Sequence, residues 1–596
     1  MLETIVLGAV AVLILVAIAI VICALAYAPM PDRPKLNRRA GARTLVVLVH
    51  GLPGRTAFEP AVALAKDVLP SADFLVPSFK SGPLSNSDPY RITNTVERAI
   101  HEAHEANAYA SIVLVGYSIG AVILRKALVW GHGLEDDRTG FGKQGERGWV
   151  KRVDRLVSLA GINRGWSLDK RPKHMNVTKF VGGRILERLA RLTRTGKMLL
   201  SVRRGAPFIA DLRVQWIRLA RGSQGKLPLA IQLVGDIDDV VSHEDSNDLS
   251  ASKDTVFITL RNTGHMAIGH ALRNRNPRDA SEAERVAKIR HVLVGPRSEL
   301  KSDLVEPLKE DLEVHRIIYV MHGIRDFGKW GDDLKKAITV SAPKERGLRV
   351  VPMKYGRFPM GPFLLYWDRQ RNVRLFMDQF TENLAQFPLA DRFDFVGHSN
   401  GTYILASALQ HYKTLKAGNV FFAGSVVPRH YDWMSLIKSG RVEKVVNVAA
   451  SNDWVVAIFP RFFEQIAEWR GKRPMTGLLD IGSAGFRGFI DGSDANNRVQ
   501  NLMFVPGQHG AAIDFHYRKR LTAVVEYAVN GESAAFDAFE EVKREPWWMD
   551  LMSNLSPVVW LLLAAILFWV GYSISAAGWW WTVAYLVVLL VVLTLF

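Results

Sequence analysis

The chain has 596 residues, which is too long for one hydrophobic core, so we expect about two to four structural units. Its formal net charge of +18 favours an acidic partner, such as an anionic membrane surface or a nucleic acid. The only cysteine is Cys23, which excludes an intramolecular disulfide and is typical of a reducing compartment.

The N-terminal region predicts a membrane anchor. Residues 5–28 carry no charge, and this run exceeds the roughly 20 residues that a helix needs to cross a bilayer. We therefore expect a transmembrane anchor over residues 1–28, followed by a basic juxtamembrane linker over residues 29–43. Basic residues next to a span mark its cytoplasmic side, so the middle of the chain is expected in the cytoplasm. A cleaved signal peptide is the alternative, but the first four residues lack its positive charge.

Apolar runs alternate with helical stretches after this linker. The expected strands are residues 44–49, 74–76, 111–115, 155–160, 229–234 and 256–260. Such an alternation predicts an α/β fold with a mostly parallel, doubly wound sheet that helices cover on both faces. In that architecture the active site lies just beyond the carboxyl ends of the strands.

One motif at such a strand end has the form of a nucleophile elbow. Residues 116–120 read Gly-Tyr-Ser-Ile-Gly between an apolar strand and a helix, and a sharp turn there exposes the hydroxyl of Ser118. Asp238 and His265 follow two later strands, which gives the order Ser, Asp, His along the chain. The alternatives are Asp236 and Asp239 for the acid, and His243 and His270 for the base.

This arrangement resembles the α/β-hydrolase superfamily, and in particular its lipase and esterase branch, over residues 44–295. The resemblance implies that Ser118 is the nucleophile, that His265 is the general base and acid, and that Asp238 orients the imidazole. It also implies an oxyanion hole formed by the backbone N–H groups of Leu52 and Ile119.

A basic segment over residues 163–226 interrupts this half where lipases of this fold usually carry a lid. It contains sixteen lysines and arginines against three acidic residues. Apolar residues lie at helical spacing among them, namely Phe180, Ile185, Leu186, Leu189 and Leu192. This pattern predicts a helix on an anionic membrane surface. A solvated basic face and a nucleic-acid patch are alternatives, although no nucleic-acid-binding module accompanies the charge.

The same pattern restarts after a charged linker over residues 296–313. The expected strands are residues 315–320, 393–396, 419–423, 444–449 and 501–505. The resemblance extends to this half and implies a second α/β-hydrolase domain over residues 314–540, in tandem with the first. It assigns the nucleophile to Ser399, the acid to Asp453 and the base to His509, with His516 as the alternative base. The oxyanion donors would be the amides of Ile324 and Asn400.

The C-terminal region, residues 541–596, predicts a transmembrane hairpin. Residues 551–596 carry no charge and are long enough for two spans, at about residues 558–574 and 579–595. With the N-terminal anchor, this makes a multi-pass integral membrane protein.

These features together predict a membrane-anchored serine hydrolase. It would cleave carboxylic esters of lipids, or other acyl esters and thioesters, through an acyl-serine intermediate. The alternative is a non-catalytic or half-catalytic membrane module that binds a lipid or a protein partner on hydrolase scaffolds. No glycine-rich nucleotide loop and no metal-ligand spacing is present in the sequence, so no cofactor and no metal are expected.

Overall fold

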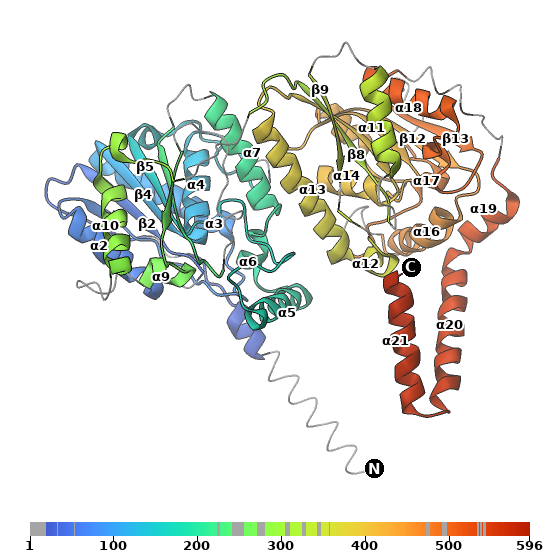
Figure 1. The fold of residues 1–596 in the computed structure, drawn as a ribbon, viewed down its shortest axis with the longest axis horizontal. Coiled ribbons are helices and arrows are strands. Elements are labelled where there is room, and N and C mark those ends of the chain that lie inside the picture. Colours follow the sequence, from blue (N-terminus) through green and yellow to red (C-terminus); the bar gives the residue numbers. More distant parts are fainter. Residues whose placement is uncertain are drawn as a thin grey trace. The chain divides into compact units, whose positions relative to one another are not determined.

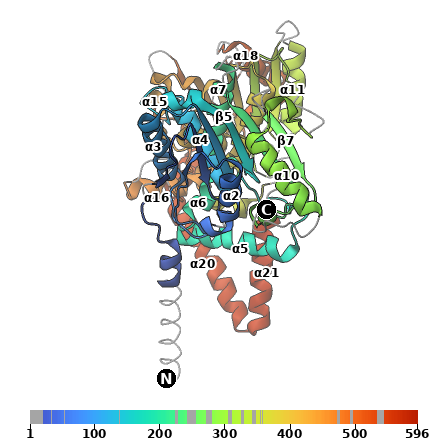
Figure 2. The same ribbon diagram turned by 90° about the vertical axis from the view of Figure 1, so that its left-hand side faces the viewer.

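The chain folds into two compact units in a computed structural model. Figures 1 and 2 show its helices and strands. The structure describes residues 20–31, 34–52, 54–136, 138–222, 227–240, 255–270, 280–303, 310–324, 329–341, 347–353, 355–356, 358–471, 477–491, 497–532, 536, 539 and 544–595. The first unit comprises Met1–Lys309 with Leu384–Gln386, and the second comprises Glu310–Asn383 with Phe387–Phe596.

A seven-stranded sheet forms the centre of the first unit, in the order β1-β3-β2-β4-β5-β6-β7. Its strands are β1 (Leu36–Asn37), β2 (Thr44–Val49), β3 (Asp73–Leu75), β4 (Ser111–Tyr117), β5 (Val153–Leu159), β6 (Leu229–Gly235) and β7 (Thr255–Leu260). The main helices are α2 (Arg55–Val68), α3 (Pro89–Asn107), α4 (Ile119–Gly131), α5 (Val177–Thr193), α6 (Lys197–Ser201), α7 (Pro207–Gly222), α9 (His265–His270) and α10 (Ala280–Val294). All pairings are parallel except that between β1 and β3.

Alternating side chains of β2 show why this sheet is covered on both faces. Leu45 and Val47 belong to a core that includes side chains of α3, α4 and α7. Val46 and Leu48 belong to a second core, with side chains of α2 and α10. Because neighbouring residues of a strand point to opposite faces, a strand buried on both sides is apolar throughout its length.

The second unit contains a six-stranded parallel sheet in the order β13-β12-β11-β10-β8-β9. Its strands are β8 (Arg316–Met321), β9 (Leu348–Met353), β10 (Arg392–His398), β11 (Ala417–Ala423), β12 (Val442–Ala450) and β13 (Val499–Val505). Its helices include α11 (Lys329–Ser341), α12 (Met360–Leu364), α13 (Tyr366–Gln386), α14 (Asn400–His411), α15 (Trp433–Lys438), α16 (Trp454–Trp469), α17 (Ala484–Arg487), α18 (Arg518–Asn530) and α19 (Trp547–Asn554).

The two sheets share one strand order. Without β1, the first sheet runs β3-β2-β4-β5-β6-β7, and the second runs β9-β8-β10-β11-β12-β13 in matching chain order. The expected mostly parallel α/β architecture is therefore confirmed. Sequence reasoning missed the edge strand β9, whose Arg349 and Pro352 hide the strand pattern because an edge strand tolerates both.

The segment between the units packs partly against the first one. Leu300 is buried in its core, and the backbone N–H of Asp303 donates to the carbonyl of Phe257 at 2.8 Å. The first residues of the predicted linker over residues 296–313 therefore pack beside β7.

Two apolar helices follow α19. Helix α20 (Ser556–Ser575) is long and apolar enough to cross a membrane, and α21 (Trp579–Leu595) is apolar but shorter. Figure 1 shows them side by side, projecting from the second unit. Most of the predicted N-terminal anchor lies outside the described residues, of which 20–26 are helical.

Candidate active sites

Ser118 lies at a sharp turn between β4 and α4. Its φ of 53° and ψ of −119° are strained for a residue with a side chain, as expected of a nucleophile elbow. The neighbouring strand β5 stabilises the turn, since the Ser118 N–H donates to the carbonyl of Leu159 at 2.9 Å. A Cβ atom at Gly120 would lie 2.1 Å from the carbonyl oxygen of Val49, so the start of α4 packs directly on β2.

The structure brings the other two predicted residues to this serine. His265 Nε2 lies 3.2 Å from Ser118 Oγ, and His265 Nδ1 lies 2.9 Å from Asp238 Oδ2. All three residues are buried. With Nδ1–H donated to the carboxylate, Nε2 can accept the proton of the hydroxyl. Of the alternative bases, His243 and the side chain of His270 lie outside the described residues.

The two alternative acids have other partners. Asp236 accepts the Thr263 N–H at 3.0 Å and so ties the loop after β6 to the loop after β7. Burial raises the pKa of Asp236, but hydrogen bonds from backbone N–H groups outweigh it and hold the pKa below its usual value. Asp239 forms an ion pair with Lys179 of α5. Neither carboxylate is bonded to His265.

The predicted oxyanion donors, Leu52 and Ile119, lie beside Ser118. Leu52 and Ile119 line the same cavity as Ser118. Ile119 is the first residue of α4, where an amide has no partner within the helix. A Cβ atom at Gly51 would lie 2.6 Å from the Cβ of Ser118, so the His-Gly turn approaches the elbow this closely only because the residue is glycine.

A cavity of about 400 Å³ extends from Ser118 beneath α5. Its lining is almost wholly apolar and comprises Leu52, Pro83, Ser118, Ile119, Ile162, Trp166, Leu168, Met175, Lys179, Gly183, Leu186, Leu199, Val240, His265 and Met266. A site that combines apolar walls with a few polar groups at one end fits a ligand with an apolar chain and a polar reacting group.

Helix α5 covers this cavity, but its apolar residues do not form one face. Leu186 lines the cavity, whereas Ile185 is 61% exposed and Leu192 is 67% exposed. The basic insertion also contains core structure, because α7 packs against α4. Some of its charge is paired, since Glu187 binds both Arg191 and Arg203.

Ser399 repeats the backbone geometry of Ser118 in the second unit. Its φ is 52° and its ψ is −119°, and its N–H donates to the carbonyl of Ala423 at 3.0 Å. The residue is buried at the start of α14. The same strained turn is thus present at the same place in both sheets.

The predicted acid and base of the second unit are hydrogen-bonded to each other, but the predicted base is not hydrogen-bonded to the serine. His509 Nδ1 lies 2.8 Å from Asp453 Oδ2. His509 Nε2 is buried and has no hydrogen-bond partner in the described part of the chain. The alternative base, His516, is exposed and not bonded to this carboxylate. The structure therefore joins Asp453 to His509, and neither of these side chains is hydrogen-bonded to Ser399.

A tyrosine, Tyr355, lies beside the predicted oxyanion donor Asn400 in the second site. The Asn400 amide group donates to Tyr355 Oη at 3.2 Å, and the Tyr355 hydroxyl donates to the carbonyl of His322. The Tyr355 ring stacks on His322 with centroids 4.1 Å apart. Ile324 ends this His-Gly turn and is partly buried. Sequence reasoning missed Tyr355, because it follows an edge strand that carries no recognisable motif.

Comparisons with known proteins point to one class of protein. The family described as Lipase (class 2) matches residues 95–181, which contain the elbow at Ser118. Solved structures that match include a lipase-esterase related protein from Clostridium acetobutylicum, at 14% identity and a TM-score of 0.26, covering 44% of this chain and 99% of that one. A monoacylglycerol lipase from Paleococcus ferrophilus matches at 12% identity and a TM-score of 0.28, covering 44% and 98%. No curated protein matches. The chain resembles the lipases and esterases of the α/β-hydrolase superfamily.

Two further residues contribute to these hydrolase-like sites. Tyr117 and His398 directly precede Ser118 and Ser399, at a variable position of the elbow motif. The Tyr117 hydroxyl donates to the backbone carbonyl of His265 at 3.1 Å. His398 Nε2 lies 3.2 Å from the backbone carbonyl of His509. Sequence reasoning missed both, because this position of the motif admits many residue types. Among the described residues, no group of histidine, cysteine, aspartate and glutamate side chains is arranged to hold a metal ion.

Proposed function

We propose that the protein is a membrane-anchored serine hydrolase that cleaves carboxylic esters of lipids, or other acyl esters and thioesters, through an acyl-serine intermediate. The observation that carries this proposal is the hydrogen-bonded series from Ser118 through His265 to Asp238 at the end of an apolar cavity. The anchors are the apolar helix α20 and the uncharged N-terminal run, with both units on the cytoplasmic side.

The reaction follows from the geometry of the first site. His265 Nε2 takes the proton of Ser118 Oγ as this oxygen attacks the ester carbonyl, and the amides of Leu52 and Ile119 stabilise the resulting oxyanion. His265 then gives the proton to the leaving alcohol or thiol, and the acyl group remains on Ser118. A water molecule, deprotonated by His265, attacks the acyl-serine and releases the carboxylic acid. Asp238 holds the imidazole in the required tautomer throughout.

An acyl chain is the substrate part that fits the cavity best. Ser118 and His265 line the cavity together with mostly apolar residues. Transfer of an alkyl chain from water into such a site contributes about 0.8 kcal/mol per methylene.

The exposed side of α5 supports an anionic membrane surface as a partner. Val181 and Ile185 are exposed one helical turn apart, and the exposed Arg184 and Arg188 flank them. Apolar side chains beside arginines suit the boundary between lipid headgroups and acyl chains. Membrane contact there would place the mouth of the first cavity near its substrate.

An alkyl fluorophosphonate probe tests the covalent mechanism. The wild-type protein in detergent or vesicles should be labelled at Ser118, and Ser118→Ala should abolish that label. Mass spectrometry of the labelled peptides separates Ser118 from Ser399. A wild-type protein that takes up no probe at either serine would exclude the acyl-serine mechanism.

A half-catalytic protein is the second candidate. Within the described part of the chain His509 Nε2 has no hydrogen-bond partner, which favours this candidate because a serine without a bonded base is a weak nucleophile. In that case the second unit would bind a lipid or a partner, and only Ser118 would turn over substrate. Lipid analysis of cells carrying Ser118→Ala, Ser399→Ala or both separates the two candidates.

A further inference from the structure

The hairpin of α20 and α21 attaches to the second unit at elements that follow the carboxyl ends of strands. The first turns of α20 pack on α16, which follows β12, and α21 packs on α12, which follows β9. Figure 1 shows both attachments beneath the second sheet. In a parallel sheet the carboxyl ends of all strands lie along one edge, and here that edge also carries Ser399 and His509.

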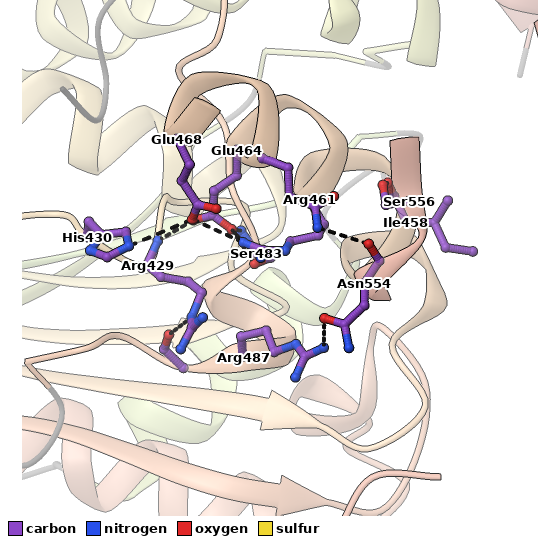
Figure 3. Close-up of polar contacts among 12 residues, drawn as sticks. Arg429, His430, Ile458, Arg461, Glu464, Glu468, Ser483, Arg487, Asn554 and Ser556 are labelled. Carbon is purple, nitrogen blue, oxygen red and sulfur yellow. Dashed lines mark hydrogen bonds and ion pairs between the residues drawn. The ribbon is translucent and has the colours of Figure 1, made fainter. Parts of the chain in front are cut away.

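Polar contacts fix α20 to α16 (Figure 3). The Ser556 hydroxyl donates to the carbonyl of Ile458 at 2.6 Å, and the Trp560 indole N–H lies 3.4 Å from the same oxygen. The Trp560 ring also contacts Phe459 and Phe462, with centroids 5.0 Å and 5.4 Å away. The first turns of the hairpin are therefore packed against the unit, in contrast to the exposed length of α20 beyond them.

A second contact holds α19, which leads into the hairpin. Arg487 of α17 forms an ion pair with Asp550 at 2.5 Å. It also donates to Asn554 Oδ1 at 3.0 Å (Figure 3). Ser483, just before α17, donates to the buried carboxylate of Glu464 in α16. Polar contacts thus join α16 to α17 and α17 to α19, so the start of the hairpin is bound to this edge of the sheet.

Helix α16 presents an apolar stripe beside this attachment. Trp454 is exposed, and the residues that follow it at helical spacing are partly buried, namely Val455, Ile458, Phe459, Phe462, Phe463 and Ile466. Of these, Phe459 and Phe462 contact Trp560 of α20. The exposed Trp469 lies at the other end of the helix. The stripe continues the apolar surface of α20, and exposed tryptophans are typical of the membrane interface.

The N-terminus of α16 is part of the second site. Asp453 caps the helix by accepting the Val456 N–H at 3.0 Å through one carboxylate oxygen, and its other oxygen binds His509. Helix α17 also connects the attachment of the hairpin to the second site. Its Gly485 N–H donates to the backbone carbonyl of Ser425 at 2.7 Å. The neighbouring residue, Gly424, packs against the His509 ring, because a Cβ atom there would lie 2.8 Å from it.

We propose that α16 lies in the interface of the bilayer that holds the hairpin, so that the second site opens at the membrane surface and takes an acyl lipid of that bilayer as its ligand. This inference rests on the membrane anchoring in the proposed function, but it does not require Ser399 to be catalytic. It assigns the bilayer, and not the aqueous phase, as the source of the ligand.

Depth measurements on the full chain in vesicles test the placement. Cysteine would be introduced at an exposed position of α16, as Trp454→Cys or Trp469→Cys, in a Cys23→Ser background, and labelled with a fluorophore. The matched control is Lys438→Cys, which is exposed near the amino end of β12, and a strand of nine residues separates the two ends by about 30 Å. A quencher attached to lipid headgroups should quench the labels on α16 more strongly than the control label, because quenching requires the label and the quencher to be close together.

A charge exchange tests the polar contacts of Arg487. Arg487→Asp should reduce the quenching of the α16 label, and Arg487→Asp with Asp550→Arg should restore it. Equal quenching at α16 and at position 438 in the wild-type protein would overturn the placement. Unchanged quenching of the α16 label in Arg487→Asp would also overturn the placement.

The ligand is tested with a phospholipid that carries a photoreactive acyl chain within the vesicles. It should crosslink to the second unit near Ser399, and an excess of unlabelled phospholipid should compete whereas a short water-soluble ester should not. Absence of a crosslink in the second unit, or competition by the soluble ester alone, would overturn the assignment of the ligand. Probe labelling at Ser118 is independent of these results, so failure here is distinguishable from failure of the hydrolase mechanism.

Discussion

At the scale of single residues, both candidate sites hold the predicted base, a histidine, by its backbone as well as by its ring. Tyr117 and His398 occupy the same motif position, and each donates to the carbonyl of the histidine in its own unit. Burial and the charge of Asp238 raise the pKa of Tyr117, so its hydroxyl remains a donor. Burial lowers the pKa of His398 to about 3, so its ring is neutral near pH 7. These are positioning residues, because neither touches the reacting atoms.

Removal of the Tyr117 hydroxyl should slow the first site without unfolding it. The lost hydrogen bond is worth about 1 kcal/mol, which corresponds to a roughly fivefold lower rate of Ser118 labelling in Tyr117→Phe. Time-resolved probe labelling measures this rate, and Ser399 in the same molecule is the internal control. In the second unit, His398→Tyr should keep the donor and His398→Phe should lose it. A wild-type rate in Tyr117→Phe would show that the ring of His265 is held without this contact.

Acid should destabilise the second unit through His398. The pKa of a histidine exposed to water is 6.5, and that of His398 falls to about 3 because the ring is buried and lies beside His509 and His322, with burial as the main cause. Between these values the unfolded chain binds a proton that the folded chain does not, so the stabilising contribution is complete above pH 6.5 and is lost as the pH falls towards 3. The thermal unfolding midpoint of the wild type should fall between about pH 7 and about pH 4.5 by more than that of His398→Tyr. Parallel curves for the two proteins would contradict this.

At the scale of elements, the elbows depend on the close approach of a helix to the neighbouring strand. A Cβ atom at Gly120 would lie 2.1 Å from the Val49 carbonyl oxygen, and one at Gly401 would lie 2.3 Å from that of Met321. Gly120→Ala should therefore displace α4 and abolish labelling at Ser118 while Ser399 keeps its wild-type behaviour. Gly401→Ala should have the reverse effect.

The control for this pair is a glycine with open space around it. A Cβ atom at Gly182 of α5 would meet nothing within 4 Å, so Gly182→Ala should be neutral or stabilise the helix by about 0.5–1 kcal/mol. Thermal unfolding and labelling of all three variants make the comparison. Normal labelling of Ser118 in Gly120→Ala would show that α4 can shift without cost to the site.

The elements that could be predicted from the sequence are those whose signal is local. Apolar runs and the two elbow motifs mark the central strands, and their order along the chain places the acid and base loops at one edge. The two sides of α5 could not be predicted, because Leu186 and Ile185 are both apolar and only the packed fold decides that one faces the cavity. Nor could the missing hydrogen bond between His509 and Ser399, since it depends on the path of the loop after β13 and not on which residues are present.

At the scale of the whole molecule, two units with one strand order differ in how completely the three site residues are joined. In the first unit the histidine bridges serine and acid, with Nε2 at 3.2 Å from Ser118 Oγ. In the second unit the corresponding nitrogen of His509 has no hydrogen-bond partner among the described residues. The histidine is therefore hydrogen-bonded to the serine in the first unit and not in the second.

This difference predicts unequal dependence of the two serines on their histidines. A positioned general base accelerates attack by about 10²- to 10⁴-fold, so His265→Ala should slow labelling of Ser118 by a factor in that range. His509→Ala should slow labelling of Ser399 far less, because the wild-type Ser399 already lacks a hydrogen-bonded base. Both rates can be measured in one vesicle sample, and Asp453→Asn should likewise affect Ser399 less than Asp238→Asn affects Ser118. Equal losses in the two units would mean that His509 reaches Ser399 during the reaction, and the protein would then act with two complete sites.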